Sequence, residues 1–317
     1  MEKQIPSTYE RVSKPLRQSG VELLKIIGII LVIISHVVQT LTTGSAEWAI
    51  DIYKGIRDPI TFIVAFLRYS GALGNILFFT CSAWYLLDKE KTNYQKVMRM
   101  VFDILTISLI WLIPILIWKK GELDAGMIFR CFFPTYYNNN WYMTSYILFC
   151  FVYPVLNLLI KHLSQRKHLI LAISLFIAYF VLSFIYFFPW SNIASFWITL
   201  YFVLSYFRKY GLRICESKTI NIIILFSSIA LHVLLLFLSN YLLIEKGMVG
   251  IMNWYYNNNP LLFLIAFSSL NLMRMCKFSS KVINYVSSLS MLIYVIHENI
   301  LFRTYLRPLI WEAIYKN

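Results

Sequence analysis

The sequence has few charged residues and, above all, few acidic ones. Only 14% of its 317 residues are charged, with 15 Asp and Glu against 29 Lys and Arg, whereas soluble domains have about 25% charged residues. It also lacks a Walker loop, a Gly-rich dinucleotide fingerprint, a GxSxG motif and a His-x-x-x-His motif. These absences argue against a soluble globular protein, a phosphate-driven pump and a serine hydrolase.

Cysteine is scarce and scattered along the chain. No two cysteines have CxxC spacing, and no pair falls in one loop on the oxidising side of a membrane. The five are Cys81, Cys131, Cys150, Cys215 and Cys276. The sequence therefore predicts neither a disulfide framework nor a zinc site, and no metal is expected.

Long apolar runs occupy most of the chain. Hydrophobic residues make up 59% of the sequence, and its mean hydropathy is +0.65. Runs of about 18–25 apolar residues are long enough to cross a bilayer as helices. The sequence therefore predicts one all-α transmembrane bundle over residues 1–317, with nine to ten spans. The nine predicted spans are residues 22–42, 70–87, 98–118, 141–160, 169–188, 190–207, 219–243, 259–273 and 282–302.

The basic residues predict the orientation of this bundle. Residues 1–21 are basic and lead into a first span that has no signal-peptide cleavage site. With this segment in the cytosol, 19 of the 29 Lys and Arg residues lie on the cytosolic side, as the positive-inside rule requires. The net charge of +14 thus indicates topology, and no nucleic acid partner is expected. Residues 303–317 form an amphipathic tail or an incomplete last helix.

Ionisable residues inside the predicted spans are candidates for function, because burying them in a bilayer is costly. Lys25 and His36 are eleven residues apart in the first span. At about 100° and 1.5 Å per residue, this spacing puts both on one helix face, about 16 Å apart along the axis. Lys25 would attract phosphates, and neutral His36 could take a proton from a hydroxyl. The alternatives are a snorkelling lysine and a histidine that hydrogen-bonds a neighbouring helix.

His297 and Glu298 form a second group, near the outer end of the ninth predicted span. Side chains of adjacent helical residues point about 100° apart, so these two are not expected to pair with each other. His297 could line the same cavity as His36, or it could lie at the wet interface. His232 lies among leucines and is interpreted as structural.

Two similar segments lie on the predicted outer face. Residues 136–141 read YYNNNW and residues 254–259 read WYYNNN. An aromatic belt with Asn helix caps is the simpler interpretation. Amides beside aromatic rings are also suited to binding a polyhydroxylated sugar. The candidate acceptor-binding residues are Tyr136, Tyr137, Asn140, Trp141, Tyr255, Tyr256 and Asn257.

Four stretches, in order along nearly the whole chain, resemble a known family. They are Lys25 to His36 with its ten-residue gap, Phe78–Ala83 (FFTCSA), Asn140–Tyr142 leading to Pro154, and Ser287–Ser288 leading to the Tyr294–Asn299 segment. Together they are similar to motifs of the acyltransferase type 3 family, bacterial integral membrane proteins that O-acylate cell-surface polysaccharides. Two departures are Ala83, where the family usually has Gly, and nine predicted helices where the family usually has ten.

The resemblance implies a function and a site. Acetyl-CoA or another acyl-CoA would be the cytosolic donor, and a carbohydrate hydroxyl would be the acceptor, on or toward the outer side of a bacterial cytoplasmic membrane. His36 would be the catalytic residue, as general base or transient acyl relay. Lys25 and Arg99 would contact the donor, and Ser82, His297 and Glu298 would line the cavity.

Two other functions remain open at this point. A transporter or flippase for a sugar-lipid or a small polar solute would also need a polar cavity between helices. Gly- or Pro-interrupted helices in matching halves would favour transport, and the sequence has none that stand out. A scaffold of a polysaccharide assembly complex would need no buried histidine. Dependence on an acyl-CoA separates the enzyme from both.

Overall fold

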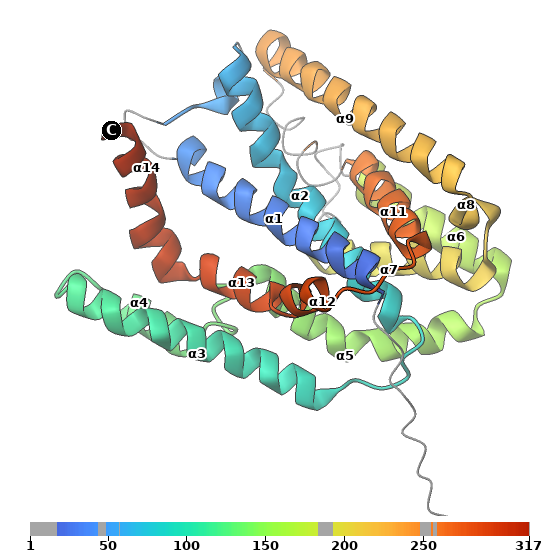
Figure 1. Cartoon of the computed structure of the whole chain (residues 1–317), viewed down its shortest axis with the longest axis horizontal. Helices are drawn as coiled ribbons and strands as arrows, with labels where there is room; N and C mark the ends of the chain where they lie inside the picture. The colour runs from blue at the N-terminus through green and yellow to red at the C-terminus, as the bar shows by residue number, and fades with distance from the viewer. Residues whose placement is uncertain are drawn as a thin grey trace, which may run out of the picture.

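The computed structural model describes residues 18–43, 49–56, 58–182, 193–247, 255 and 259–316. These residues form an all-helical bundle, and none of them is in a β-strand. α1 (Ser19–Thr43) lies near the middle of the molecule, beside α2 (Pro59–Leu86), as Figure 1 shows. α3 (Tyr94–Trp118) and α9 (Lys218–Lys246) lie at opposite edges.

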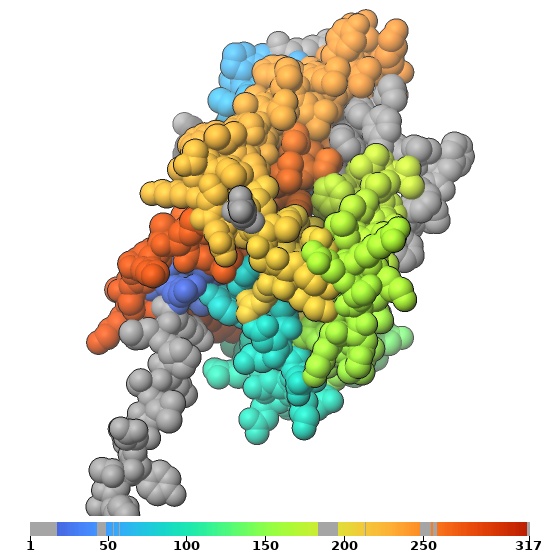
Figure 2. Space-filling view, turned by 90° about the vertical axis from the view of Figure 1, so that its right-hand side faces the viewer, coloured from blue at the N-terminus to red at the C-terminus, as the bar shows by residue number. Residues whose placement is uncertain are grey.

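The other helices surround this centre. α9 packs on α11 on one outer face of the molecule, and α6 lies on the same face (Figure 2). Their bounds are α4 (Ala125–Phe132), α5 (Trp141–His162), α6 (Gln165–Phe176) continued by a π-helical turn (Ile177–Val181), α7 (Ile193–Tyr210), α8 (Arg213–Glu216) and α11 (Pro260–Met275). The chain ends in α12 (Lys281–Ser288), α13 (Ser290–His297), a π-helical turn (Phe302–Leu306) and α14 (Arg307–Lys316); a short 3-10 turn covers Ile52–Lys54.

Polar caps mark where several helices begin. The Asp58 carboxylate accepts hydrogen bonds from the backbone of the first turn of α2, directly before a proline. Asn259 caps α11 in the same way, again before a proline, and Asn93 caps α3. These side chains satisfy backbone N–H groups that have no partner within the helix. At the far end of α9, Gly247 has a φ of 63°, a conformation that favours glycine.

Close packing of α1 on α2 holds the middle of the bundle together. A Cβ added to Gly74 would lie 2.5 Å from the carbonyl oxygen of Gly28, so only small residues allow this approach. The hydroxyl of Ser70 donates to the carbonyl of Leu31, and that of Ser35 donates to the carbonyl of Arg68. Backbone contact and cross-helix hydrogen bonds therefore fix α1 at the depth of His36.

The C-terminal helices form one strongly bent unit. The axis turns by 64° between Lys281–His297 and Phe302–Tyr315. At the break, the side chain of Asn299 accepts a hydrogen bond from the backbone N–H of Leu301 and so begins the next helix. Glu298 lies at this break, next to the end of α13. Broken helices of this kind occur in membrane proteins where the freed backbone is buried in protein or lines a cavity.

The nine predicted spans are only partly reproduced. Among the described residues, five helices are long and apolar enough to cross a membrane, or six if the bent C-terminal pair is one span. α11 has 16 residues, or about 24 Å at 1.5 Å per residue, which is shorter than a hydrocarbon core of about 30 Å. The predicted spans 169–188 and 190–207 include residues outside the described part of the chain. The cytosolic amino terminus stays a prediction.

Two of the predicted boundaries are wrong for identifiable reasons. The span predicted at 70–87 begins at Pro59, because Asp58 caps a helix that continues past Arg68. The span predicted at 282–302 is interrupted at Leu289 and again at Glu298. Hydropathy averaged over a window misses both interruptions of the last span, because each polar stretch is short: residues 287–290 (SSLS) and residues 297–299 (HEN).

We expect Gly74→Ala to lower the thermal midpoint of the detergent-solubilised protein by several degrees. The added methyl group meets the α1 backbone, which cannot rotate away, and overpacking of this kind costs about 1–3 kcal/mol. Ala230→Val is the control, because residue 230 is exposed on α9. Equal midpoints for the two variants would contradict close α1–α2 packing.

Candidate active site

His36, His297 and Glu298 meet where the C-terminal half of α1 faces the break after α13. The Nδ1 atom of His36 lies 2.7 Å from Oε2 of Glu298 and 3.1 Å from Nε2 of His297. The His36 side chain is 12% exposed and the Glu298 side chain 3%. The structure thus brings the catalytic candidate His36 together with the cavity candidates His297 and Glu298, which follow it by more than 260 positions in the sequence.

The hydrogen bonds determine which nitrogen atoms carry protons. Nδ1 of His297 lies 2.8 Å from the carbonyl oxygen of Ile293, so it is the donor and Nε2 of His297 is left as an acceptor. The Nδ1–H of His36 then donates to the carboxylate of Glu298, with Nε2 of His297 as a second acceptor. In the neutral imidazole this leaves Nε2 of His36 with a lone pair and no partner among the described residues. That atom can accept a proton.

Two arginines hold the Glu298 carboxylate in place. Nη2 of Arg307 lies 3.0 Å from Oε2, and Nη1 of Arg303 lies 3.0 Å from Oε1. The same Arg307 also donates to the backbone carbonyls of His36 and His297. Its side chain is 2% exposed, against 42% for Arg303. Arg307 therefore links α14, α13 and α1 around one buried charge.

The three side chains of the cluster also have the donor types of a metal site, with ligand atoms within 4.8 Å of one another. Two ligands on a tetrahedral zinc ion, each about 2.0–2.1 Å from the metal, lie about 3.3 Å apart. The 2.7 Å between His36 and Glu298 is instead a hydrogen-bond distance. Two guanidinium groups on the same carboxylate would also repel a dication. We interpret the cluster as a hydrogen-bonded histidine–carboxylate group held by arginine.

The N-terminal half of α1 borders two cavities that share Lys25 and Glu22. One of about 460 Å³ also contains Ser82, Arg99 and Lys96 in its wall. The second, about 720 Å³, is lined by Arg208 and Arg274 among others. Both volumes fall in the range of ligand pockets, about 300–1,000 Å³. The ammonium group of Lys25 lies 3.5 Å from the Glu22 carboxylate and is 18% exposed at the side chain.

A narrow slot extends from the 460 Å³ cavity toward the histidines. Its volume is about 10 Å³, room for about one water molecule. The slot and the cavity share Phe78, Met143 and Met291. Ile29 and Val32 of α1 line the slot, and with Lys25 and His36 they follow the i, i+4, i+7, i+11 spacing of a single helix face. One face of α1 therefore borders the cavity, the slot and the histidine cluster in turn.

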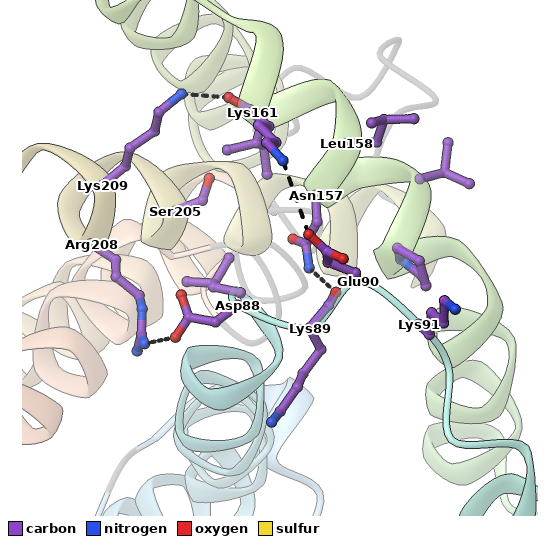
Figure 3. A pocket seen from close by; sticks show the side chains of 14 residues that line it. Asp88, Lys89, Glu90, Lys91, Asn157, Leu158, Lys161, Ser205, Arg208 and Lys209 are labelled. Carbon is purple, nitrogen blue, oxygen red and sulfur yellow. Dashed lines mark hydrogen bonds and ion pairs between the residues drawn. The ribbon is translucent and has the colours of Figure 1, made fainter.

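A further cavity shares Arg208 with the 720 Å³ cavity. It has a volume of about 780 Å³ and lies between α5, α7 and the segment after α2, as Figure 3 shows. Arg208 pairs with Asp88, and the Asn157 amide donates to the carbonyl oxygens of Leu86 and Lys89. Its wall contains neither Lys25 nor any histidine.

The acceptor candidates are in different surroundings. Tyr136 is 83% and Tyr137 39% exposed, and their rings pack edge to face. Asn140 is buried at the start of α5, followed by the partly buried Trp141. Tyr255 is fully buried and stacks on His232, so its ring faces the protein interior. Tyr256 and Asn257 lie outside the described residues.

Comparison with known families identifies the chain. The sequence model of one family, described as an acyltransferase domain of type 3, matches residues 18–315. The chain belongs to this family. A search of curated proteins and a search of solved structures gave no significant match. The protein is therefore a membrane acyltransferase with several apolar helices.

Sequence reasoning missed three residues of this acyltransferase. Arg303 and Arg307 belong to the predicted tail, where basic residues look like surface charges, and their contacts with Glu298 depend on the bend of the chain. Tyr294 entered the sequence analysis only as part of a family motif and not as a candidate site residue. In the structure its ring centroid lies 6.4 Å from that of His36. The one available signal was spacing, because Tyr294 precedes His297 by three residues and so shares its helix face.

Arg307→Ala is expected to destabilise the acyltransferase by about 3–5 kcal/mol, because it leaves a buried carboxylate with one partner fewer. Arg303→Ala removes a half-exposed partner of the same carboxylate and should cost about 1 kcal/mol or less. Thermal unfolding in detergent measures both. A loss for Arg303→Ala as large as that for Arg307→Ala would contradict the central place given to Arg307.

Proposed function

We propose that this acyltransferase moves an acetyl group from cytosolic acetyl-CoA to a hydroxyl of a bacterial surface polysaccharide or its lipid-linked precursor. The observation that carries the proposal is the single face of α1 that borders the Lys25 cavity, the slot and His36. A donor with an anionic head and a long thin arm matches this order, with the head in the cavity beside Lys25 and the arm in the slot that leads toward His36. A hydroxyl acceptor fits the far end, where the imidazole is held as a base.

The cavities next to Lys25 have the chemistry of a site for the phosphates of the donor. Lys25 and Arg99 both face the 460 Å³ cavity, and lysine and arginine are the usual phosphate contacts in proteins. Glu22, which accepts a hydrogen bond from Ser287, keeps the Lys25 ammonium group in place. The distance along α1 from Lys25 to His36, about 16 Å, is comparable to the length of an extended pantetheine arm.

His36 is assigned the role of general base. Its Nδ1–H is bound to Glu298, so Nε2 is oriented by the carboxylate as in other histidine–carboxylate pairs. Nε2 takes the proton of the acceptor hydroxyl as the oxygen attacks the thioester carbon. Glu298 stabilises the imidazolium that results, and the same proton then goes to the leaving thiolate. Nε2 of His297 lies against the same Nδ1–H and further limits the rotation of the His36 ring.

The acceptor is expected to come from the side opposite the donor cavity. The first aromatic segment, with Tyr136 and Tyr137 at its exposed tip, is the candidate surface for sugar rings. Arg130 lies over the Tyr137 ring, 5.8 Å from its centroid, and adds a donor for sugar hydroxyls. The narrow slot supports transfer over transport, because it suits a thin acyl chain better than a sugar-lipid.

His36→Ala is expected to abolish transfer. Membranes that contain the wild-type chain or a variant receive radiolabelled acetyl-CoA on the cytosolic side, and label is measured in the polysaccharide fraction. His162→Ala is the control, because His162 is exposed at the end of α5. An active His36→Ala protein would refute the mechanism, and no label from an inserted wild-type chain with polysaccharide present would refute the function.

Lys25→Gln is expected to raise the KM for acetyl-CoA by about 10- to 100-fold, since a hydrogen bond to a charged group contributes about 1.5–3 kcal/mol. The KM for the acceptor should not change. Lys246→Gln, an exposed lysine at the end of α9, is the control. Equal acetyl-CoA KM values for Lys25→Gln and the wild type would remove Lys25 from the donor site.

A further inference from the structure

The buried hydroxyl group of Tyr294 has no acceptor for its own hydrogen among the described residues. The residue is 4% exposed, and its Oη makes no hydrogen bond of normal geometry among the described residues. A buried hydroxyl left unpaired costs free energy, about 1–3 kcal/mol by mutational data. Such a group in a cavity wall is therefore a candidate for a bond that a ligand completes.

This hydroxyl lies between the donor cavity and the histidines. Tyr294 lines the slot together with Met143 and Met291, which also line the 460 Å³ cavity. Its ring centroid lies 6.4 Å from that of His36 and 5.5 Å from that of His297. These distances allow a single carbonyl group in an opened slot to lie within reach of both the Tyr294 hydroxyl and the His36 base.

The start of α5 makes the slot favourable for negative charge. Tyr142, in the first turn of α5, lines the slot, and its backbone amide faces the Tyr294 hydroxyl. The amides of a first helical turn have no partner within the helix and lie at its positive end. Asn140 makes no side-chain cap there, and its buried Nδ2 has no partner among the described residues. Since an N–H only donates, this contact leaves the hydrogen of the Tyr294 hydroxyl free for another acceptor.

We propose that Tyr294 is a catalytic residue that donates a hydrogen bond from Oη to the acyl carbonyl oxygen of the donor thioester. This inference rests on the proposed function. Acyl transfer develops negative charge on the carbonyl oxygen of the thioester, and neither His36 nor Glu298 stabilises that charge. Tyr294 is assigned this role. The positive end of α5 reinforces the donor, and the flexible side chains of Met143 and Met291 move aside to admit the acyl group.

The step balances as follows. The acceptor oxygen forms a bond to the thioester carbon while its proton passes to Nε2 of His36. The carbonyl π electrons move to the oxygen, and the resulting oxyanion accepts the hydrogen bond from Tyr294 Oη. The carbonyl then re-forms, the carbon–sulfur bond breaks, and the thiolate takes the proton from His36. The products are the ester and free CoA, and Tyr294 remains protonated throughout.

Tyr294→Phe is expected to lower kcat by about 10²–10³-fold, the usual loss for one oxyanion donor, with little change in the KM for acetyl-CoA. Tyr201→Phe is the matched control, because it deletes a buried hydroxyl that bonds Asn157, away from the slot. A kcat for Tyr294→Phe that equals that of Tyr201→Phe would overturn the proposal, as would a loss confined to KM.

Infrared spectroscopy gives a second test. The C=O stretching frequency of the bound thioester changes only if Tyr294 bonds the carbonyl oxygen, and it would not change if Tyr294 had a structural role alone. Acetyl-CoA with a ¹³C carbonyl is bound without acceptor, and the isotope difference spectrum reports the thioester C=O stretch. We expect a lower frequency in the wild type and in Tyr201→Phe than in Tyr294→Phe. The same frequency in all three proteins would overturn the hydrogen bond.

The two proposals fail in different ways. If no His36-dependent label enters the polysaccharide, the proposed function fails, whatever Tyr294 does. If label requires His36 but Tyr294→Phe transfers it as fast as Tyr201→Phe, the function stands and the assignment of Tyr294 falls.

Discussion

One buried carboxylate organises the part of this protein around His36. Glu298 is 3% exposed at its side chain and accepts hydrogen bonds from His36, Arg303 and Arg307. A carboxylate so buried requires such partners, since the cost of removing it from water is several kcal/mol. The requirement explains the bend after α13, which turns the chain back and brings Arg307 to the same charge. The position of the base and the path of the C-terminal helix therefore have a common electrostatic cause.

The fold makes the two ends of α1 chemically different. Near the N-terminal end, Lys25 borders two cavities. Near the C-terminal end, His36 lies among buried polar groups, where hydrogen bonds and charge interactions are stronger than in water. The glycine contact between α1 and α2 holds this helix close against its neighbour. One helix thus carries a cation beside the cavities and a histidine in the buried cluster.

The sequence predicted the helical class, the first helix and the common face of Lys25 and His36, because a continuous helix fixes angular spacing. It could not predict the cluster around Glu298. From the sequence, His297 and Glu298 are candidates for the cavity of His36, but no bond from either to His36 is predicted, whereas both contact that residue on a distant helix. Arg307 lies in a segment whose apolar pattern is weak, so nothing local indicates its burial. Hydropathy likewise identifies apolar runs, but it gives no information on where a helix bends or ends within a run.

The narrowness of the slot has a consequence for the cell as well as for the substrate. Under the proposed function, the protein would take a donor from one side of a membrane and reach toward the other side, which would open a route for protons and ions. The slot between Phe78, Met143 and Met291 has a volume of only about 10 Å³. An apolar space of this size excludes a hydrated ion. The residues that would move to admit an acyl chain are then the ones that would preserve the electrochemical gradient between turnovers.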